Sequence, residues 1–146
     1  MTRVIVCDID GTLSDPTHRQ HFVRSKPKNW SAFAAGIPLD SPHQDIIWLL
    51  KVLKAAGCTI LLASGRGEES REDTIEWLMK HNIPFDALYM RNRNDYRADN
   101  IVKKELLDQM IIDGHKPYMV FDDRDQVVNM WRDNGLRCLQ VSPGNF

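Results

Sequence analysis

Val4-Ile5-Val6-Cys7-Asp8-Ile9-Asp10-Gly11-Thr12 joins an apolar strand directly to a polar turn near the start of the chain. Residues two apart on a strand point to the same side, so we expect Asp8 and Asp10 to face one site, while Gly11 lets the chain turn out of the sheet. Two carboxylates this close repel each other, and a bound cation or one protonated carboxyl offsets that repulsion. An ordinary Asp-Gly turn is the competing interpretation. The uninterrupted run favours phosphoryl transfer, with an aspartate nucleophile, an aspartic acid proton donor and a magnesium ion.

The rest of the chain alternates short apolar runs with helical patterns, which is typical of an α/β domain. We predict strands at Val4–Asp8, Thr59–Ala63, Ala87–Met90, Met119–Phe121 and Arg137–Val141. Helices are predicted from a Ser41 N-cap with Pro42 and Gln44 in the first turn up to Gly57, and at 71–81, 100–112 and 125–134. The expected fold is a Rossmann-like, mainly parallel five-stranded sheet with helices on both faces and a minimal cap, in a single domain over residues 1–146.

Composition excludes several classes of protein. The net charge of −1 gives the whole chain no strong attraction to nucleic acid or to an anionic membrane. The three cysteines, Cys7, Cys58 and Cys138, lie in apolar runs without CxxC spacing, which favours reduced core residues and a cytoplasmic protein. No run is long and apolar enough to span a bilayer, and the chain begins without a signal peptide, so we expect no membrane partner. The sequence leaves the oligomeric state open, including a homo-oligomer.

The segment 14–39 departs from the alternating pattern and has no clear sheet register. Four Lys/Arg residues against Asp15 alone give it a net charge of +3. It follows the first strand on the side where open α/β sheets build their sites, so it is a candidate flap or mini-cap over the site. The alternative is a solvated loop with a short helix near Trp30. His18 and His21 lie three apart, but they have no Cys or acidic partner in a metal-binding pattern.

The ends of the neighbouring strands supply the other parts of a phosphoryl-transfer site. Parallel strands end at one edge of a sheet, so Ser64, Gly65 and Arg66 after the second strand should lie near Asp8 and bind phosphate oxygens. Asp122 and Asp123 follow the fourth strand, where adjacent carboxylates can bind one Mg²⁺ ion. Alone, each of these motifs also fits a solvated turn or a helix start.

A fixed positive charge beside the nucleophile is expected from Lys103. Its neighbour Lys104 points about 100° away around a helix, so only one of the two should face the site. Asp99 lies four residues before Lys103, on the same helix face, and would orient it through an ion pair. A surface ion pair is the alternative.

The set Asp8-Ile9-Asp10-Gly11-Thr12, Ser64, Lys103 and Asp122-Asp123 resembles the four motifs of the haloacid-dehalogenase superfamily of phosphohydrolases, and it spans nearly the whole chain. The tail, FDDRDQVVNMWR at 121–132 with QVSPGNF at 140–146, is similar to the end of phage polynucleotide kinases, whose C-terminal half is a 3′-phosphatase. The chain has no Walker-type GxxxxGK[ST] motif, so the kinase half is expected to be absent. A phage-encoded member would work in the cytoplasm of the infected host cell.

This resemblance implies a Mg²⁺-dependent polynucleotide 3′-phosphatase that acts on nucleic acid 3′-phosphate ends through an aspartyl phosphate. It implies these roles: catalytic Asp8, Asp10, Lys103 and Arg66; substrate-binding Thr12, Ser64, Gly65, Arg19 and Asp99; metal-binding Asp8, Asp10, Asp122 and Asp123. The segments 14–39 and 91–104, each with a net charge of +3, would follow the nucleic acid backbone. A phosphatase for small metabolites or nucleotides is the alternative enzyme, and a receiver-type signalling domain is the non-enzyme alternative.

Overall fold

The first strand lies at the centre of a parallel sheet. In the computed structural model, which describes residues 2–146, β1 (Val4–Cys7) pairs with β4 (Thr59–Gly67) on one side and with β6 (Pro117–Asp122) on the other. The outer strands are β5 (Ala87–Arg91) and β7 (Arg137–Gln140), which gives the order β5-β4-β1-β6-β7 with every pairing parallel. The five predicted strands and the predicted fold class are therefore confirmed.

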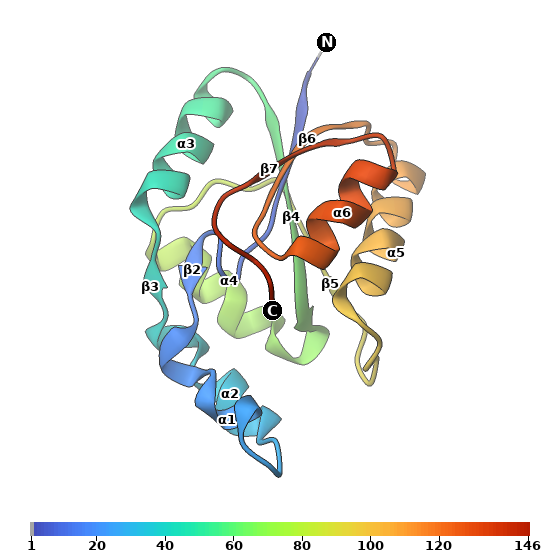
Figure 1. The fold of residues 1–146 in the computed structure, drawn as a ribbon. Helices are drawn as coiled ribbons and strands as arrows, with labels where there is room; N and C mark the ends of the chain where they lie inside the picture. Colours follow the sequence, from blue (N-terminus) through green and yellow to red (C-terminus); the bar gives the residue numbers. More distant parts are fainter. Residues whose placement is uncertain (1) are drawn as a thin grey trace.

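Four helices cover the two faces of the sheet (Figure 1). They are α3 (Gln44–Ala55) and α4 (Arg71–Lys80) on one face, and α5 (Asp99–Ile112) and α6 (Asp125–Asp133) on the other. The alternation of side chains along β1 requires two cores: Ile5 and Cys7 pack with α3 and α4, whereas Val4 and Val6 pack with α5 and α6. Asp8 leaves the sheet between these cores, at its carboxyl edge.

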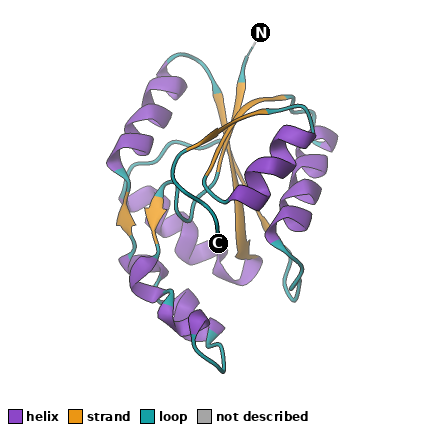
Figure 2. Ribbon diagram, viewed as in Figure 1, coloured by secondary structure: helices purple, strands orange, loops and turns teal. Residues whose placement is uncertain are grey.

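An insert of residues 14–42 projects from this edge of the body and returns to it (Figures 1 and 2). Its two ends, β2 (Ser14–Asp15) and β3 (Ser41–Pro42), form a short antiparallel pair. Between them lie 3-10 turns at Thr17–Arg19 and Ile37–Leu39 and two short helices, α1 (His21–Arg24) and α2 (Trp30–Ala35). The short helix near Trp30 is confirmed, whereas the insert does have a sheet register at its ends.

The predicted start of the α3 helix is wrong. Ser41 does not cap it, because Ser41 and Pro42 are extended and pair with Asp15 and Ser14 in the β2–β3 ladder. The helix begins at Gln44, after a His43 N-cap that makes no side-chain capping bond. The pairing of Ser41 and Pro42 with β2 therefore overrides the local preference of Ser41 for a helix N-cap. Within residues 2–146, no helix combines the length and the apolar character needed to cross a membrane.

Candidate active site

Asp8 lies at the centre of the site and is almost fully buried. Its Oδ1 accepts a hydrogen bond from Lys103 Nζ at 2.7 Å, and its Oδ2 accepts one from Thr12 Oγ1 at 3.0 Å. Lys103 comes from the first turns of α5 and is itself buried, while Lys104 lies on the helix surface and pairs with Asp108. The prediction that only one of these lysines faces the site is confirmed.

Asp8, Asp122 and Asp123 form a group that we call the carboxylate cluster, with oxygen atoms all within 4.8 Å of one another. Lys103 Nζ also donates to Asp122 Oδ2 at 2.9 Å. Three carboxyl groups face this single ammonium group, so the cluster has an excess of negative charge when all three are ionised. Hard oxygen ligands and excess negative charge fit a divalent cation such as Mg²⁺.

The ionisation of the cluster reflects its burial. Burial raises the pKa of Asp8 well above its usual value, and the charge of Asp122 adds to the effect. Burial also raises the pKa of Asp123 to about 6. Lys103 shows the opposite balance: burial alone would lower its pKa, but Asp122 and Asp8 raise it above the usual value, so it stays charged. A cation would favour the ionised form of all three carboxylates.

Gly11 makes room for this cluster. Its φ of +86° is a left-handed conformation that glycine adopts freely. A Cβ built at this position would lie 2.0 Å from Asp123 Oδ2, closer than any real contact. The glycine of the Asp-Gly-Thr sequence therefore serves both the turn and the approach of Asp123, which follows the neighbouring strand β6 although it is distant along the chain.

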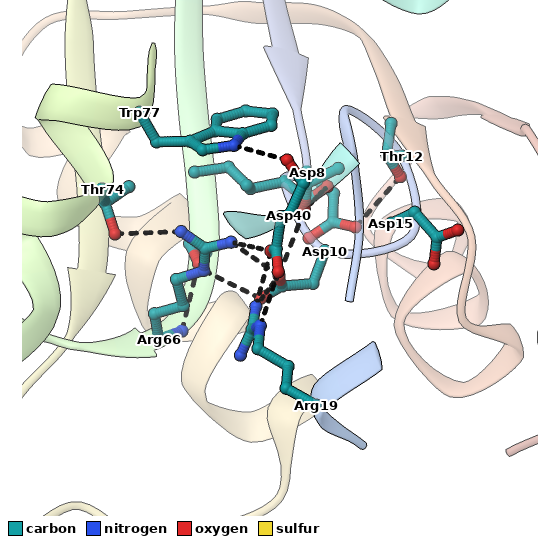
Figure 3. A network of polar contacts seen from close by, with 12 residues as sticks. Asp8, Asp10, Thr12, Asp15, Arg19, Asp40, Arg66, Thr74 and Trp77 are labelled. Carbon is teal, nitrogen blue, oxygen red and sulfur yellow. Dashed lines mark hydrogen bonds and ion pairs between the residues drawn. The ribbon is translucent and has the colours of Figure 1, made fainter. Parts of the chain in front are cut away.

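Asp10 does not join the carboxylate cluster, contrary to its predicted place among the metal ligands. Its Oδ1 accepts from Arg66 Nη2 at 2.7 Å and from Arg19 Nη2 at 2.8 Å, and its Oδ2 accepts from Arg66 Nε at 3.0 Å (Figure 3). Burial would raise the pKa of Asp10, but the two guanidinium groups outweigh it and lower the pKa to about 2. The repulsion expected between Asp8 and Asp10 is therefore offset by arginines.

Asp40 completes this arrangement and was missed by the sequence analysis. Its buried carboxylate accepts from Arg19 Nε at 2.8 Å and from Arg66 Nη2 at 3.2 Å (Figure 3). The Asp10–Asp40 network, as we call it, consists of Asp10, Arg19, Asp40 and Arg66. Asp40 belongs to no motif in the sequence, and only the closing of the insert at β2–β3 brings it to the site.

Arg19 and Arg66 have few donors free for a substrate. Arg19 is 1% exposed, and its guanidinium donates to Asp10, to Asp40 and to the carbonyl of Phe33. Arg66 is 7% exposed and donates to the two aspartates and to Thr74 Oγ1. Both arginines were predicted to contact the phosphate or the substrate, but in this structure they contact Asp10.

The remaining predicted residues lie around the end of β4. Ser64 is buried, and its hydroxyl accepts from the backbone N–H of Arg66 at 3.1 Å. The expected ion pair between Asp99 and Lys103 is absent among the described contacts, because the Asp99 carboxylate accepts from Arg91 and Arg124 instead. A Cβ at Gly65 would lie 2.7 Å from Asp99 Oδ1, so Gly65 permits their close approach.

The C-terminal tail holds the Asp122-Asp123 turn in place. Trp131 Nε1 donates to Asp122 Oδ2 at 3.1 Å, and Gln140 Nε2 donates to the carbonyl of Asp123 at 2.8 Å. A Cβ at Gly144 would lie 1.8 Å from that same carbonyl oxygen. These contacts explain why the tail and the acid pair form one sequence pattern.

An Asp-x-Asp pair at the carboxyl edge of such a sheet, faced by a buried lysine and a carboxylate cluster, defines a phosphomonoester hydrolase of the haloacid-dehalogenase type. The family model for the polynucleotide kinase PNKP phosphatase domain matches residues 2–146. The chain belongs to this family, which decides against a receiver-type signalling domain.

The relatives agree with this assignment. A putative bifunctional polynucleotide kinase/RNA ligase of Autographa californica nuclear polyhedrosis virus is 32% identical over 135 residues, which cover 90% of this chain and 18% of that protein. A chain in the structure of the Pnkp1/Rnl/Hen1 RNA repair complex is 38% identical, with a TM-score of 0.83 over all of this chain and 44% of that one. The chain thus spans less than half the length of these relatives.

More distant structures share the fold alone. A putative phosphatase from Clostridium difficile is 14% identical, with a TM-score of 0.68 over 95% of this chain and 84% of that one. The class C acid phosphatase from Bacillus anthracis with tungstate bound is 16% identical, with a TM-score of 0.71 over 99% of this chain and 68% of that one.

Proposed function

We propose that this chain is a Mg²⁺-dependent polynucleotide 3′-phosphatase that hydrolyses 3′-phosphomonoester ends of DNA or RNA through an aspartyl phosphate. The observation that carries the proposal is the contrast between two carboxylates in one turn. Asp8 contacts Lys103 and belongs to the carboxylate cluster, whereas Asp10 is held apart by two arginines. This contrast supports a role for Asp8 in attacking the phosphate and a role for Asp10 in moving a proton.

In the first step, a carboxylate oxygen of Asp8 bonds to phosphorus while the bond to the 3′-oxygen breaks, and Asp10 gives that oxygen a proton. In the second step, water attacks the aspartyl phosphate, Asp10 takes the proton of the water, and inorganic phosphate leaves. The low pKa of Asp10 keeps it ionised, which is the form that accepts the proton in the second step. The first step requires Asp10 to take up a proton, which the negative charge of an incoming phosphate favours.

The other residues have supporting roles in this proposal. Asp8, Asp122 and Asp123 would hold Mg²⁺, which offsets the repulsion between the nucleophile and the phosphate dianion when it is bound. Lys103, Thr12 and Ser64 bind oxygens of the transferring group, and Gly65 and Asp99 contribute to substrate binding beside the end of β4. Arg19 and Arg66 act through Asp10.

The insert is the surface proposed to meet the nucleic acid strand. Arg24, Lys26 and Lys28 are exposed and have no ion pair in the part of the chain that the structure describes. Trp30 is 55% exposed beside them. Unpaired cations next to an exposed aromatic ring suit a single strand, which offers phosphates and stackable bases. Arg19 links this surface to the site, because it contacts both Phe33 and Asp10.

The segment 91–104 does not support the same role, although its net charge is +3. Four of its five cations have acidic partners: Arg91 pairs with Asp99, Arg97 with Asp95 and Glu105, Lys103 with Asp8 and Asp122, and Lys104 with Asp108. Charges that are already neutralised attract phosphates weakly. The insert therefore remains as the basic surface beside the site.

The test compares phosphate release from matched oligonucleotides that carry a 3′- or a 5′-phosphate and from nitrophenyl phosphate, each with Mg²⁺ and with a chelator. We expect release from the 3′-phosphate to be preferred and to require the metal. Equal rates on all three substrates would leave a general phosphatase and reject the 3′-end specificity. Release that persists in the chelator would reject the metal site.

A further inference from the structure

Asp40 is the one member of the Asp10–Asp40 network with no part in the proposed chemistry. It lies on the return of the insert, does not contact Asp8 and does not belong to the carboxylate cluster. Its side chain is 0% exposed, which is costly for a carboxylate unless charged or polar groups surround it. A buried charge in this position calls for an explanation.

The contacts of Asp40 are directed at the two arginines that hold Asp10. Oδ1 accepts from Arg19 Nε at 2.8 Å, and Oδ2 accepts from Arg19 Nη2 at 2.9 Å and from Arg66 Nη2 at 3.2 Å. This bidentate geometry fixes the plane of the Arg19 guanidinium. His18 Nε2 lies 2.7 Å from Oδ1 and closes the network on its exposed side.

The backbone of Asp40 is fixed as well. Its carbonyl accepts from Trp77 Nε1 at 2.9 Å, on the buried face of α4, and its N–H donates to Ile37 O at 3.1 Å. Trp77 is one of the largest buried side chains and packs in the core between α3, α4 and the sheet. The Asp40 carboxylate is therefore anchored to the body, although it belongs to the insert.

The negative charge of Asp40 balances the two arginines that hold Asp10. Two guanidinium groups face two carboxylates, so the buried network is neutral as a whole. Without the Asp40 charge, Asp10 would be the only carboxylate of the network facing both arginines, and the neutral contacts to Phe33 and Thr74 would not replace the lost bidentate pair that orients Arg19. Asp10 would then turn with it, because each of its oxygens is held by these donors.

We propose that Asp40 is a positioning residue that aims Asp10 at the reacting atoms by fixing Arg19 and Arg66. This inference rests on the proposed role of Asp10 as proton carrier. It does not rest on the choice of polymer substrate, because it concerns proton transfer in both chemical steps.

The test is Asp40→Asn, which keeps the size of the side chain but removes its charge and places N–H donors against the arginines. Nitrophenyl phosphate reports on each step separately, since nitrophenolate leaves without a proton but hydrolysis of the aspartyl phosphate still needs Asp10. We expect a rapid burst of about one nitrophenolate per folded site, followed by turnover about 10- to 100-fold slower than in the wild type. On the 3′-phosphorylated oligonucleotide, kcat should fall with little change in KM and no burst of product.

A purely structural role for Asp40 predicts a different result. Loss of folded protein lowers the size of the nitrophenolate burst and the steady-state rate together. A lower rate of nitrophenolate release without a burst therefore overturns the proposal. Unchanged turnover in Asp40→Asn overturns it as well. Leu78→Ala, in the same core but without a hydrogen bond to Asp40, is the control for destabilisation, and Asp73→Asn on the exposed face of α4 is the control for charge.

If Asp40→Asn does not fold, Asp40→Glu carries the test. It keeps the charge and moves the carboxylate by one methylene group, so we expect the same burst with turnover about tenfold below the wild type. Wild-type turnover in Asp40→Glu would overturn the proposal. The preference of the wild type for the 3′-phosphorylated oligonucleotide is measured independently. If that preference is absent, the proposed substrate is rejected, but the proposed role of Asp40 is not.

Discussion

The carboxylate cluster should make the metal-free protein lose stability as the pH rises. Asp123 has a pKa of about 6 in the folded protein, against about 3.9 in an unfolded chain. Between these values the folded state holds more protons than the unfolded state, so the free energy of unfolding falls with rising pH. A difference of about two pKa units corresponds to about 3 kcal/mol, lost between about pH 4 and pH 6. Asp8, whose pKa is also raised, acts in the same direction.

The assay is urea denaturation of the wild type and of Asp123→Asn in a chelator, from about pH 4.5 to about pH 7.5. Asparagine does not ionise, so the wild type should lose about 2 kcal/mol relative to the variant over this range, because part of the loss already lies below pH 4.5. Titrating groups away from the cluster cancel in the comparison. In the proposed metal site, Mg²⁺ binds the ionised carboxylates, so it should restore the stability of the wild type near neutral pH and have little effect near pH 4.5. The exposed Asp73→Asn serves as the control.

Parallel stability curves for the wild type and Asp123→Asn would refute the argument, because they would mean that Asp123 ionises equally easily in the folded and unfolded states. A Mg²⁺ effect of the same size at both ends of the pH range would refute the assignment of the cluster as the metal site.

Three further outcomes are expected. Asp8→Asn should lower turnover at least about 10⁴-fold, measured as phosphate release after contaminating phosphatase is excluded, and it should stabilise the metal-free protein near neutral pH by removing one charge from the cluster. Gly11→Ala should cost about 1–3 kcal/mol in urea denaturation and weaken Mg²⁺ binding, because the new Cβ meets Asp123; unchanged binding would contradict this. Lys28→Glu should lower kcat/KM for the oligonucleotide and reduce the slope of log(kcat/KM) against log salt concentration by about 1. It should leave kcat/KM for nitrophenyl phosphate unchanged. Lys51→Glu, on the exposed side of α3, should change neither substrate.

The sequence predicted the parts of the site that lie directly at strand ends. Asp8 follows β1 and Asp122 ends its parallel neighbour β6, and the geometry of a parallel sheet alone brings such positions to one edge. Lys103 could be separated from Lys104 because helical spacing lets only one of two adjacent residues face the site. In these cases a local pattern and a general rule of packing were sufficient.

The errors arose where long-range contacts decided the outcome. Asp40 carries no local signal, since its role depends on arginines 21 and 26 residues away in the chain. The same closure of the insert took Ser41 out of its expected capping position. Asp99 was placed correctly at the start of α5, but Arg91 and Arg124 compete for its carboxylate, and spacing along one helix cannot reveal such competitors.

The pairing of β2 with β3 brings the two ends of the insert side by side, so the chain leaves the body and re-enters it at nearly one point. Segments whose ends lie close together can be exchanged or lengthened without rearranging the core. A cap of another size could therefore be fitted to the same catalytic body just beyond the neck formed by β2 and β3. Arg19 and Asp40 set the limits of such an exchange, because a new cap must start after Arg19 and end before Asp40. The part of the insert that meets the substrate can then change while Asp10 stays in place.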